Sequence, residues 1–216
     1  MPIDFTQVFV YLVTDPILSE GRSELDVVRA AAAGGIRLVQ YRDKLADAPT
    51  YLEKARALSN LCRQLGVWLL LNDRVDLAAH VDCDGVHLGQ NDLSTAEAKR
   101  ILGPGKIVGR STHSADQVRR ACAEGADYVN IGPVFPTSTK DVQMAPVGLG
   151  GVGAAVSAAS VPVTTMGGIC QNNAAEVILA GADRVAVVTA ITRAPDIARA
   201  SRDLVELVER TRSQRN

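Results

Sequence analysis

The stretch GADYVNIGPVFPTSTK, residues 125–140, shows in one place the pattern that decides the fold. After a Gly-Ala-Asp turn comes a mostly apolar, β-favouring run, residues 128–134, which predicts a buried strand. Gly132 and Pro133 end its regular hydrogen bonding, because Gly weakens a strand and Pro has no amide proton to donate. Three hydroxyls and a lysine follow at residues 137–140. The stretch is therefore a strand that leads into a polar loop.

Other stretches repeat this pattern. AEGADYVNIGP (123–133) and LAGADRVAVVT (179–189) share a helix end, a Gly-Ala-Asp turn and a strand, and AAAGGIRLVQ (31–40) is a looser third copy. Such repetition is expected of a chain built from successive strand–helix units.

Strands and helices alternate eight times along the chain. Apolar runs predict strands at residues 9–14, 37–42, 67–71, 85–88, 106–110, 128–134, 161–165 and 184–189. Helical patterns predict helices at residues 24–33, 49–65, 75–80, 94–102, 115–124, 152–159, 173–180 and 196–212. This alternation implies an α/β protein with a parallel sheet, and eight units imply a closed (β/α)8 TIM barrel, one domain over residues 1–216. The alternative, an open doubly wound sheet, usually has a glycine-rich turn after its first strand, where this chain has Asp15-Pro16.

Composition excludes several classes of partner. The formal net charge is −1, so nothing indicates broad attraction to nucleic acid or to an anionic membrane. No apolar run is long enough to span a bilayer, and the first residues lack the basic start of a signal peptide, so we expect a cytoplasmic protein. The four cysteines form no C-x-x-C pair, which favours free thiols over a zinc site; they are Cys62, Cys83, Cys122 and Cys170.

Polar residues gather where the predicted strands end, which is where barrels carry their sites. Strand two ends in a row in which Gln40, Arg42 and Lys44 can point the same way, because side chains alternate along a strand. An amide, a guanidinium and an ammonium suit a ligand with an aromatic amine at one end and phosphates at the other. The alternative is that the two cations lie on the outer rim, paired with Asp43 and Asp47.

Two carboxylates follow neighbouring strands three and four. Asp73 and Asp92 could meet at the rim, and Mg²⁺ commonly uses one or two carboxylates together with substrate phosphates. The alternative is a helix-capping turn at residues 72–74, with Asp92 as a separate turn residue. A transition-metal site is less expected, because the histidines show no ligand spacing; they are His80, His87 and His113.

The later strands suggest a second anion site. Ser111 follows strand five, and its hydroxyl could bond a diphosphate oxygen. Gly168 follows strand seven and Thr189 follows strand eight, where barrels often bind phosphate through backbone amides. The loop at residues 137–140, which alone would suit a solvated turn, lies between the two sites in strand order. This layout fits the joining of two phosphorylated substrates, one of which loses diphosphate.

These motifs, taken in order, resemble the thiamine-phosphate synthase family. The matching segments span nearly the whole chain: YLVTD, VQYRDK, LLLNDRVDLA, DGVHLGQNDL, GRSTHS, GADYVNIGPVFPTSTK, MGGI and GADRVAVVTAI. The resemblance implies a TIM-barrel transferase that condenses 4-amino-2-methyl-5-(diphosphooxymethyl)pyrimidine with a thiazole phosphate, giving thiamine phosphate and diphosphate. It also implies Mg²⁺ as cofactor. Oligomeric state and the preferred form of the thiazole substrate stay open.

The resemblance further assigns roles to residues. It implies pyrimidine diphosphate contacts at Gln40, Tyr41, Arg42, Asp43, Lys44, Asn72, Ser111 and Lys140, of which Arg42, Lys44, Ser111 and Lys140 are expected to act in catalysis. It implies thiazole phosphate contacts at Thr137, Ser138, Thr139, Gly168, Val188 and Thr189, and Mg²⁺ ligands at Asp73 and Asp92. Two positions depart from the commoner family form, because Thr189 stands for Ser and Met166 for Ile.

The implied chemistry suits these residue types, since diphosphate leaves from an exocyclic methylene and the amino-pyrimidine stabilises the resulting cation. No protein nucleophile is needed, and no convincing nucleophile–base pair is apparent in the sequence. Two alternatives stay open: a thiazole tautomerase, which shares the barrel but is expected to lack the paired aspartates and the Thr-x-Thr-Lys loop, and a non-catalytic protein that binds thiamine precursors.

Overall fold

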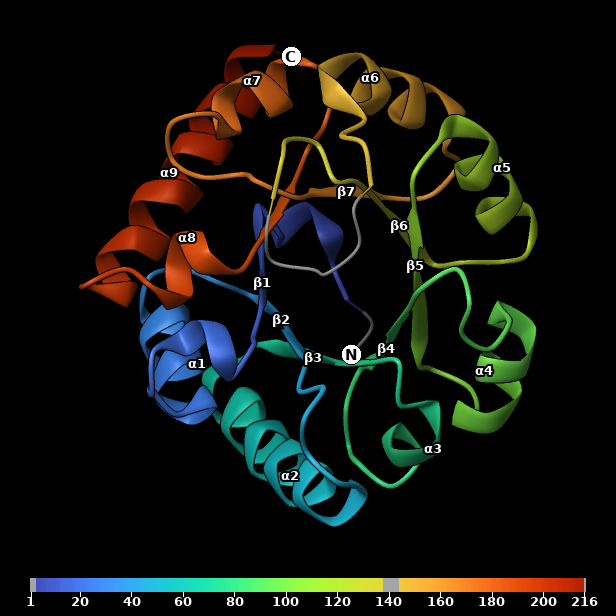
Figure 1. Ribbon diagram of the computed structural model, residues 1–216, viewed down its shortest axis with the longest axis vertical. Coiled ribbons are helices and arrows are strands. Elements are labelled where there is room, and N and C mark those ends of the chain that lie inside the picture. The colour runs from blue at the N-terminus through green and yellow to red at the C-terminus, as the bar shows by residue number, and fades with distance from the viewer. Residues whose placement is uncertain (1–2, 138–143, 216) are drawn as a thin grey trace.

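The chain forms a closed ring of parallel strands surrounded by helices (Figure 1). This computed structural model describes residues 3–137 and 144–215. Each strand pairs with its neighbour in sequence, and β1 pairs with β8 to close the ring, with Tyr11 opposite Ala186. The predicted (β/α)8 barrel is confirmed.

The strands and helices lie close to their predicted positions. The strands are β1 (Val10–Val13), β2 (Leu38–Tyr41), β3 (Trp68–Asn72), β4 (Gly85–Leu88), β5 (Ile107–Thr112), β6 (Tyr128–Ile131), β7 (Val163–Met166) and β8 (Val185–Val187). The helices are α1 (Glu24–Ala33), α2 (Ala48–Leu65), α3 (Val75–Ala78), α4 (Thr95–Leu102), α5 (Ala115–Ala123), α6 (Gly148–Ala158), α7 (Ala174–Leu179), α8 (Thr189–Thr192) and α9 (Ile197–Arg215), with 3-10 turns η1 (Phe5–Gln7) and η2 (Ile17–Ser19). The eighth strand is shorter than predicted, because Thr189 begins α8.

Local signals fix several of these boundaries. Ser94 caps α4, and Glu97 reaches back to the cap, which completes a capping box. Ser114 accepts a hydrogen bond from the amide of Gln117 at the start of α5. Gly66 ends α2 in the left-handed conformation, at φ 65°. These caps satisfy backbone groups that a helix end leaves without partners.

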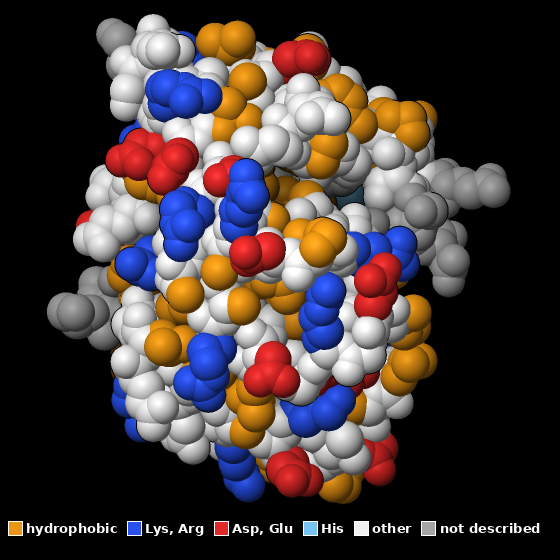
Figure 2. Space-filling model, turned by 90° about the vertical axis from the view of Figure 1, so that its left-hand side faces the viewer, with side chains coloured by type: hydrophobic (Ala, Val, Ile, Leu, Met, Phe, Trp, Pro, Cys, Tyr) orange, Lys and Arg blue, Asp and Glu red, His pale blue; other side chains and the backbone are white. Residues whose placement is uncertain are grey.

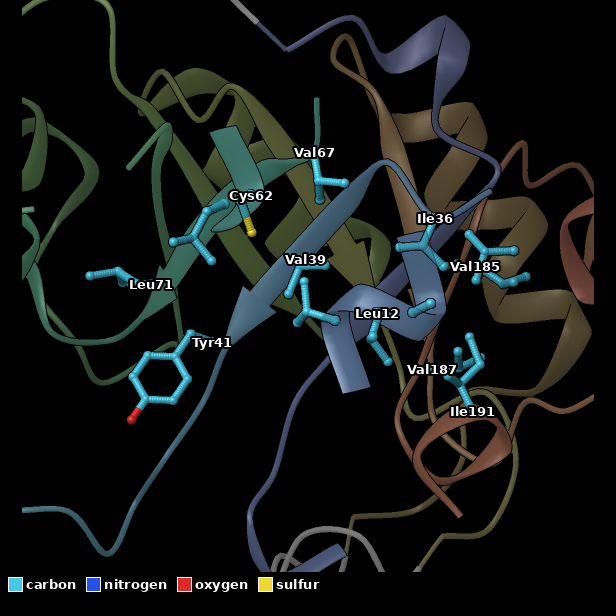
Figure 3. Packing of buried hydrophobic residues seen from close by; sticks show 14 of the residues in the cluster. Leu12, Ile36, Val39, Tyr41, Cys62, Val67, Leu71, Val185, Val187 and Ile191 are labelled. Carbon is cyan, nitrogen blue, oxygen red and sulfur yellow. The ribbon is translucent and has the colours of Figure 1, made fainter. Parts of the chain in front are cut away.

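Side chains alternate between two apolar regions. Outward-facing strand residues pack against the helices in the larger region (Figure 3), which includes Leu12, Val39, Leu71, Val185 and Val187. Inward-facing residues fill the barrel itself; they are Tyr11, Val13, Leu38, Leu70, Tyr128 and Ala186, joined by Val8. Because both faces of each strand are buried, the strands read as continuous apolar runs in the sequence.

The N-terminal segment packs against the barrel interior. The ring of Phe5 lies 5.3 Å from the ring of Tyr128. The guanidinium of Arg184 donates to the carbonyl oxygen of Phe5 at 2.9 Å and stacks over its ring at 5.5 Å. In the view down the ring, the deep-blue segment that carries η1 lies inside the circle of helices (Figure 1). The apolar floor of the barrel therefore combines strand residues with η1.

The outer surface is mixed in charge. On the face that carries α1, α8 and α9, acidic and basic side chains are interspersed (Figure 2). Among the described residues, no helix combines the length and the apolar character needed to cross a membrane.

Candidate active site at the mouth of the barrel

A cavity of about 390 Å³ opens where the strands end. Every strand or the residues directly after it contribute to its wall, as barrel geometry requires of a site at the carboxyl ends of the strands. The wall is polar on one side and apolar on the other. The polar side comes from β2 to β6 and presents Gln40, Asn72, His87, Ser111 and Asn130. The apolar side comes from β7, β8 and β1 and presents Met166, Ala186, Val188 and Val13.

A chain of hydrogen bonds crosses the floor of the polar side. Nε2 of Gln40 donates to the hydroxyl of Tyr11 at 2.5 Å, and that hydroxyl lies 3.0 Å from the hydroxyl of Tyr128. The Tyr128 hydroxyl lies 2.6 Å from Nδ1 of His87, and Nε2 of His87 lies 2.9 Å from Oγ of Ser111. Burial raises the pKa of both tyrosines, so both keep their protons at neutral pH. The chain joins five strands and ends on two residues of the cavity wall.

Two cations lie at the edge of the polar side, each paired with a carboxylate. Arg42 lines the cavity and forms an ion pair with Asp15, which directly follows β1. Lys44 forms an ion pair with Asp73. The rim alternative, in which Asp43 or Asp47 holds these cations, is therefore not the observed arrangement. The positions of the cations favour an anionic ligand at this edge.

The carboxyl groups of Asp73 and Asp92 meet, as predicted. Burial works to raise the pKa of Asp73, but hydrogen bonds and the ammonium of Lys44 outweigh it and hold the pKa below its usual value. Burial and the neighbouring Asp73 carboxylate raise the pKa of Asp92, although the amide of Gly89 donates to it at 2.6 Å. The pair concentrates negative charge that a bound cation would relieve.

This carboxylate pair fits a hard divalent ion only in part. Within residues 3–137 and 144–215, no group of three or more His, Cys, Asp or Glu side chains is placed to hold a metal ion. Two carboxylate oxygens leave most of an octahedral shell for water and ligand phosphate, which is how Mg²⁺ is commonly held. The donor set therefore suits Mg²⁺ bound together with a phosphorylated substrate.

Tight backbone packing shapes the wall after β7. Gly168 has φ 65°, and a Cβ added there would lie 2.6 Å from the carbonyl oxygen of Pro136 and 2.8 Å from Cβ of Phe135. Only glycine meets both conditions. The amide of Phe135 donates to the carbonyl oxygen of Gly167 at 3.0 Å, so the loops after β6 and β7 support one another. This backbone lies directly against the cavity, next to Val188 and Thr189.

The structure brings most of the predicted site residues that it describes to this cavity; those on its wall are Gln40, Arg42, Asn72, Ser111, Thr137, Gly168, Val188 and Thr189. Lys44, Asp73 and Asp92 lie beside the wall and do not line the cavity. Asp73 directly follows the wall residue Asn72 and contacts both Lys44 and Asp92. Ser138, Thr139 and Lys140 lie outside the described residues.

Tyr41 and Asp43 face the other way, as alternation along β2 requires. The ring of Tyr41 packs against that of Tyr51 at 4.6 Å in the layer between barrel and helices. Asp43 accepts hydrogen bonds from the amides of Leu45 and Ala46, both at 3.0 Å, and pairs with Lys54 at 3.1 Å. These two residues support the loop after β2 and do not line the cavity.

Several residues of the site were not predicted from the sequence. Asp15 has no predicted role beyond the turn after the first strand, yet it holds Arg42. His87 and Asn130 line the cavity, and Tyr11 and Tyr128 carry the hydrogen bonds beneath it. Alternation along each strand places these side chains on the inner face, so the signal was present. No signal in the sequence shows which of these side chains meet across strands that are far apart in the chain.

Comparisons with known proteins agree with this geometry. The profile of the thiamine monophosphate synthase family matches residues 10–191. A thiamine-phosphate synthase of Chloroflexus aurantiacus is 46% identical over 95% of this chain and 94% of its own. One from Moorella thermoacetica is 42% identical over 95% of this chain and 98% of its own. The solved structure of a thiamine phosphate pyrophosphorylase from Pyrococcus furiosus superposes with a TM-score of 0.86 at 36% identity, covering 95% of this chain and 97% of that one.

Proposed function

The chain belongs to the thiamine monophosphate synthase family, and on that premise we propose that it condenses 4-amino-2-methyl-5-(diphosphooxymethyl)pyrimidine with a thiazole phosphate, releasing diphosphate. The observation that carries this proposal is the divided wall of the cavity. A hydrogen-bonding half, edged by two cations, faces an apolar half built on tight backbone turns. Two different ring systems, each with phosphate, suit two such halves.

The polar half suits the pyrimidine diphosphate. Gln40 and Asn72 offer amide groups to the edge of the amino-pyrimidine ring. We assign binding of the diphosphate to Arg42, Lys44 and Ser111, which supply two cations and a hydroxyl at this edge of the cavity, and to Lys140, whose structure is not described. Preorganised positive charge lowers the energy of a departing anion, so these groups favour loss of diphosphate from the methylene carbon.

Asp73 and Asp92 would hold Mg²⁺ against this diphosphate. When bound, the ion supplies further neutralisation of the charge that grows on the leaving group. Without that ion, the ammonium of Lys44 pairs with the carboxylate of Asp73. Once another cation takes its place there, the ammonium is available to move toward the diphosphate oxygens.

The other half suits the thiazole phosphate. Backbone amides at Gly168, Val188 and Thr189 and the hydroxyl of Thr137 line this half and can hold its phosphate. We propose that Ser138 and Thr139, which lie outside the described residues, add their hydroxyls. The apolar wall then holds the ring with its nitrogen close to the methylene cation, and proximity supplies much of the rate. No protein nucleophile enters this scheme.

The test is to incubate the protein with both substrates and Mg²⁺ and to measure diphosphate and thiamine phosphate. Formation of both supports the proposal, and no diphosphate refutes it. Isomerisation of the carboxylated thiazole without use of the pyrimidine would indicate a tautomerase instead, and binding of both precursors without any turnover would indicate a sensor.

Two variants with a matched control test the roles of the charged residues. We expect Asp92→Ala to weaken Mg²⁺-dependent turnover far more than binding of thiazole phosphate, and equal loss of both would contradict its role. Lys140→Ala should slow turnover, and full activity would remove Lys140 from the site. Asp116→Ala removes an exposed carboxylate on α5 whose one ion-pair partner among the described residues is Arg119 on the same helix, so it should leave both properties unchanged.

A further inference from the structure

The chain of hydrogen bonds beneath the cavity has a fixed direction, because its first atom, the amide nitrogen of Gln40, can only donate. Nε2 of Gln40 is an amide nitrogen and gives a proton to the hydroxyl of Tyr11. Among the described residues, that hydroxyl has one other partner, the hydroxyl of Tyr128. The Tyr11 proton must therefore point to Tyr128, since the reverse arrangement would leave a buried O–H proton without an acceptor.

The same reasoning fixes the direction of the hydrogen bonds made by His87. Tyr128 accepts from Tyr11, so its own proton goes to Nδ1 of His87, 2.6 Å away. A neutral imidazole whose Nδ1 accepts carries its proton on Nε2. Nε2 of His87 therefore donates to Oγ of Ser111 at 2.9 Å. The tautomer of His87 on β4 therefore follows from the amide of Gln40 on β2.

Ser111 is the last member of the chain and lines the cavity. Because its oxygen accepts from His87, its own proton is directed elsewhere and can point into the cavity. A hydroxyl that presents its proton suits an anionic oxygen and does not suit a group that offers only N–H protons. The matching acceptor class is a phosphate oxygen at the edge where Arg42 lies.

The members of the chain are held firmly. Tyr11 and Tyr128 are fully buried, and their rings meet edge to face at 6.1 Å. Gly109 leaves the space that the Tyr128 ring fills, since a Cβ there would lie 2.1 Å from it. Burial also keeps both hydroxyls protonated, so neither can reverse the chain by ionising. The direction is therefore a fixed property of the fold.

We infer that Tyr11, Tyr128 and His87 are positioning residues that turn the hydroxyl of Ser111 into a proton donor for the diphosphate of the pyrimidine substrate. The inference rests on the proposed function for the identity of the ligand. The state of His87 can be measured without any substrate, so the two can fail separately.

The first experiment is a ¹⁵N NMR spectrum of histidine-labelled protein at neutral pH without ligand. His87 is assigned by the signal that disappears in His87→Gln. We expect the pattern of a neutral ring with its proton on Nε2, and in Tyr128→Phe we expect this pattern to be lost or mixed with the other tautomer. A proton on Nδ1, or a doubly protonated ring, in the unchanged protein would overturn the inference.

The second experiment is a kinetic double-mutant cycle. Tyr128→Phe should raise KM for the pyrimidine diphosphate about tenfold, the loss expected for one hydrogen bond to a charged group, and should leave KM for thiazole phosphate within about twofold. Because Tyr128 acts through Ser111, adding Tyr128→Phe to Ser111→Ala should cause little further loss. Independent, multiplying losses in the double variant would instead indicate a general structural role and refute the inference.

Tyr51→Phe is the matched control. Tyr51 is also buried, but it lies in the layer between barrel and helices, and among the described residues its hydroxyl donates weakly to the backbone carbonyl oxygens of Tyr41 and Asn72, at 3.3 and 3.4 Å, and takes no part in the hydrogen bonds beneath the cavity. We expect this variant to keep both KM values and the His87 spectrum. If the unchanged protein makes no thiamine phosphate, the proposed function fails, while the NMR result still decides the state of His87.

Discussion

Replacing Gly109 with alanine should destabilise the barrel, because the added methyl group has no room. Its Cβ would lie 2.1 Å from two carbon atoms of the Tyr128 ring and 2.5 Å from the ring hydroxyl. Ordinary carbon–carbon contact is about 3.5 Å, so the ring must retreat by more than about 1 Å. Phe5 at 5.3 Å, His87 at 5.4 Å and Tyr11 at 6.1 Å surround it. Retreat therefore also pulls the hydroxyl away from its hydrogen bonds.

The cost can be set from these two effects. Overpacking of a core costs about 1–3 kcal/mol, and a buried hydroxyl that loses its partners costs about 1–3 kcal/mol more. We expect Gly109→Ala to lower the free energy of unfolding by about 2–6 kcal/mol, which corresponds to a fall of roughly 4–24 °C in Tm. Equilibrium unfolding in urea, followed by circular dichroism, measures the change directly.

Gly150→Ala is the control, since among the described residues nothing lies within 4 Å of a Cβ added at this position in α6. It should raise stability by up to about 1 kcal/mol, because alanine favours a helix more than glycine does. A Gly109→Ala protein whose urea midpoint and m-value match those of the unchanged chain would refute the packing argument. Equal changes in the free energy of unfolding for Gly109→Ala and Gly150→Ala would also refute it.

Three further predictions concern buried polar groups. The hydroxyl of Ser201 in α9 is fully buried and has no hydrogen-bond partner among the described residues. Ser201→Ala should therefore stabilise the protein by about 1 kcal/mol and raise Tm by roughly 2–4 °C, which calorimetry can measure. Burial raises the pKa of the Cys62 thiol to about 12, so at pH 8 iodoacetamide should label it only after unfolding, and mass spectrometry of the native protein showing rapid labelling would contradict this. Burial works to raise the pKa of Asp43, but two backbone amides and Lys54 outweigh it and lower that pKa. Its contribution is therefore present above the unfolded pKa, about 3.9, and is lost as pH falls through the lower folded value, so the stability gap between the unchanged protein and Asp43→Asn should be full at pH 6 and shrink in acid.

The fold was predictable because its signals are local. Apolar runs such as residues 67–71 predict strands, and caps such as Ser94 predict the start of a helix, from neighbouring residues alone. Eight alternations then leave few topologies. The end of the eighth strand was less clear, since the apolar residues continue past Val187 and Thr189 could have continued the strand or, as observed, begun a helix.

The site was predictable in position more than in detail. Barrel geometry placed Arg42, Lys44 and Asp73 at one mouth, but which carboxylate holds which cation depends on contacts between strands. Asp15 and Arg42 come from different strand–helix units, and Tyr11 and Tyr128 are 117 residues apart. Periodicity shows which face such a residue occupies but says nothing of its partner on another strand.

The pairing of β1 with β8 has a consequence for how the chain is made. The first strand, Val10–Val13, needs the last, Val185–Val187, before its second edge is covered. During synthesis on the ribosome, the growing sheet keeps two open edges until β8 has emerged. Open edges of apolar strands invite pairing with other chains. The period in which this sheet can aggregate therefore lasts from the emergence of β1 to that of β8 and ends when the ring closes.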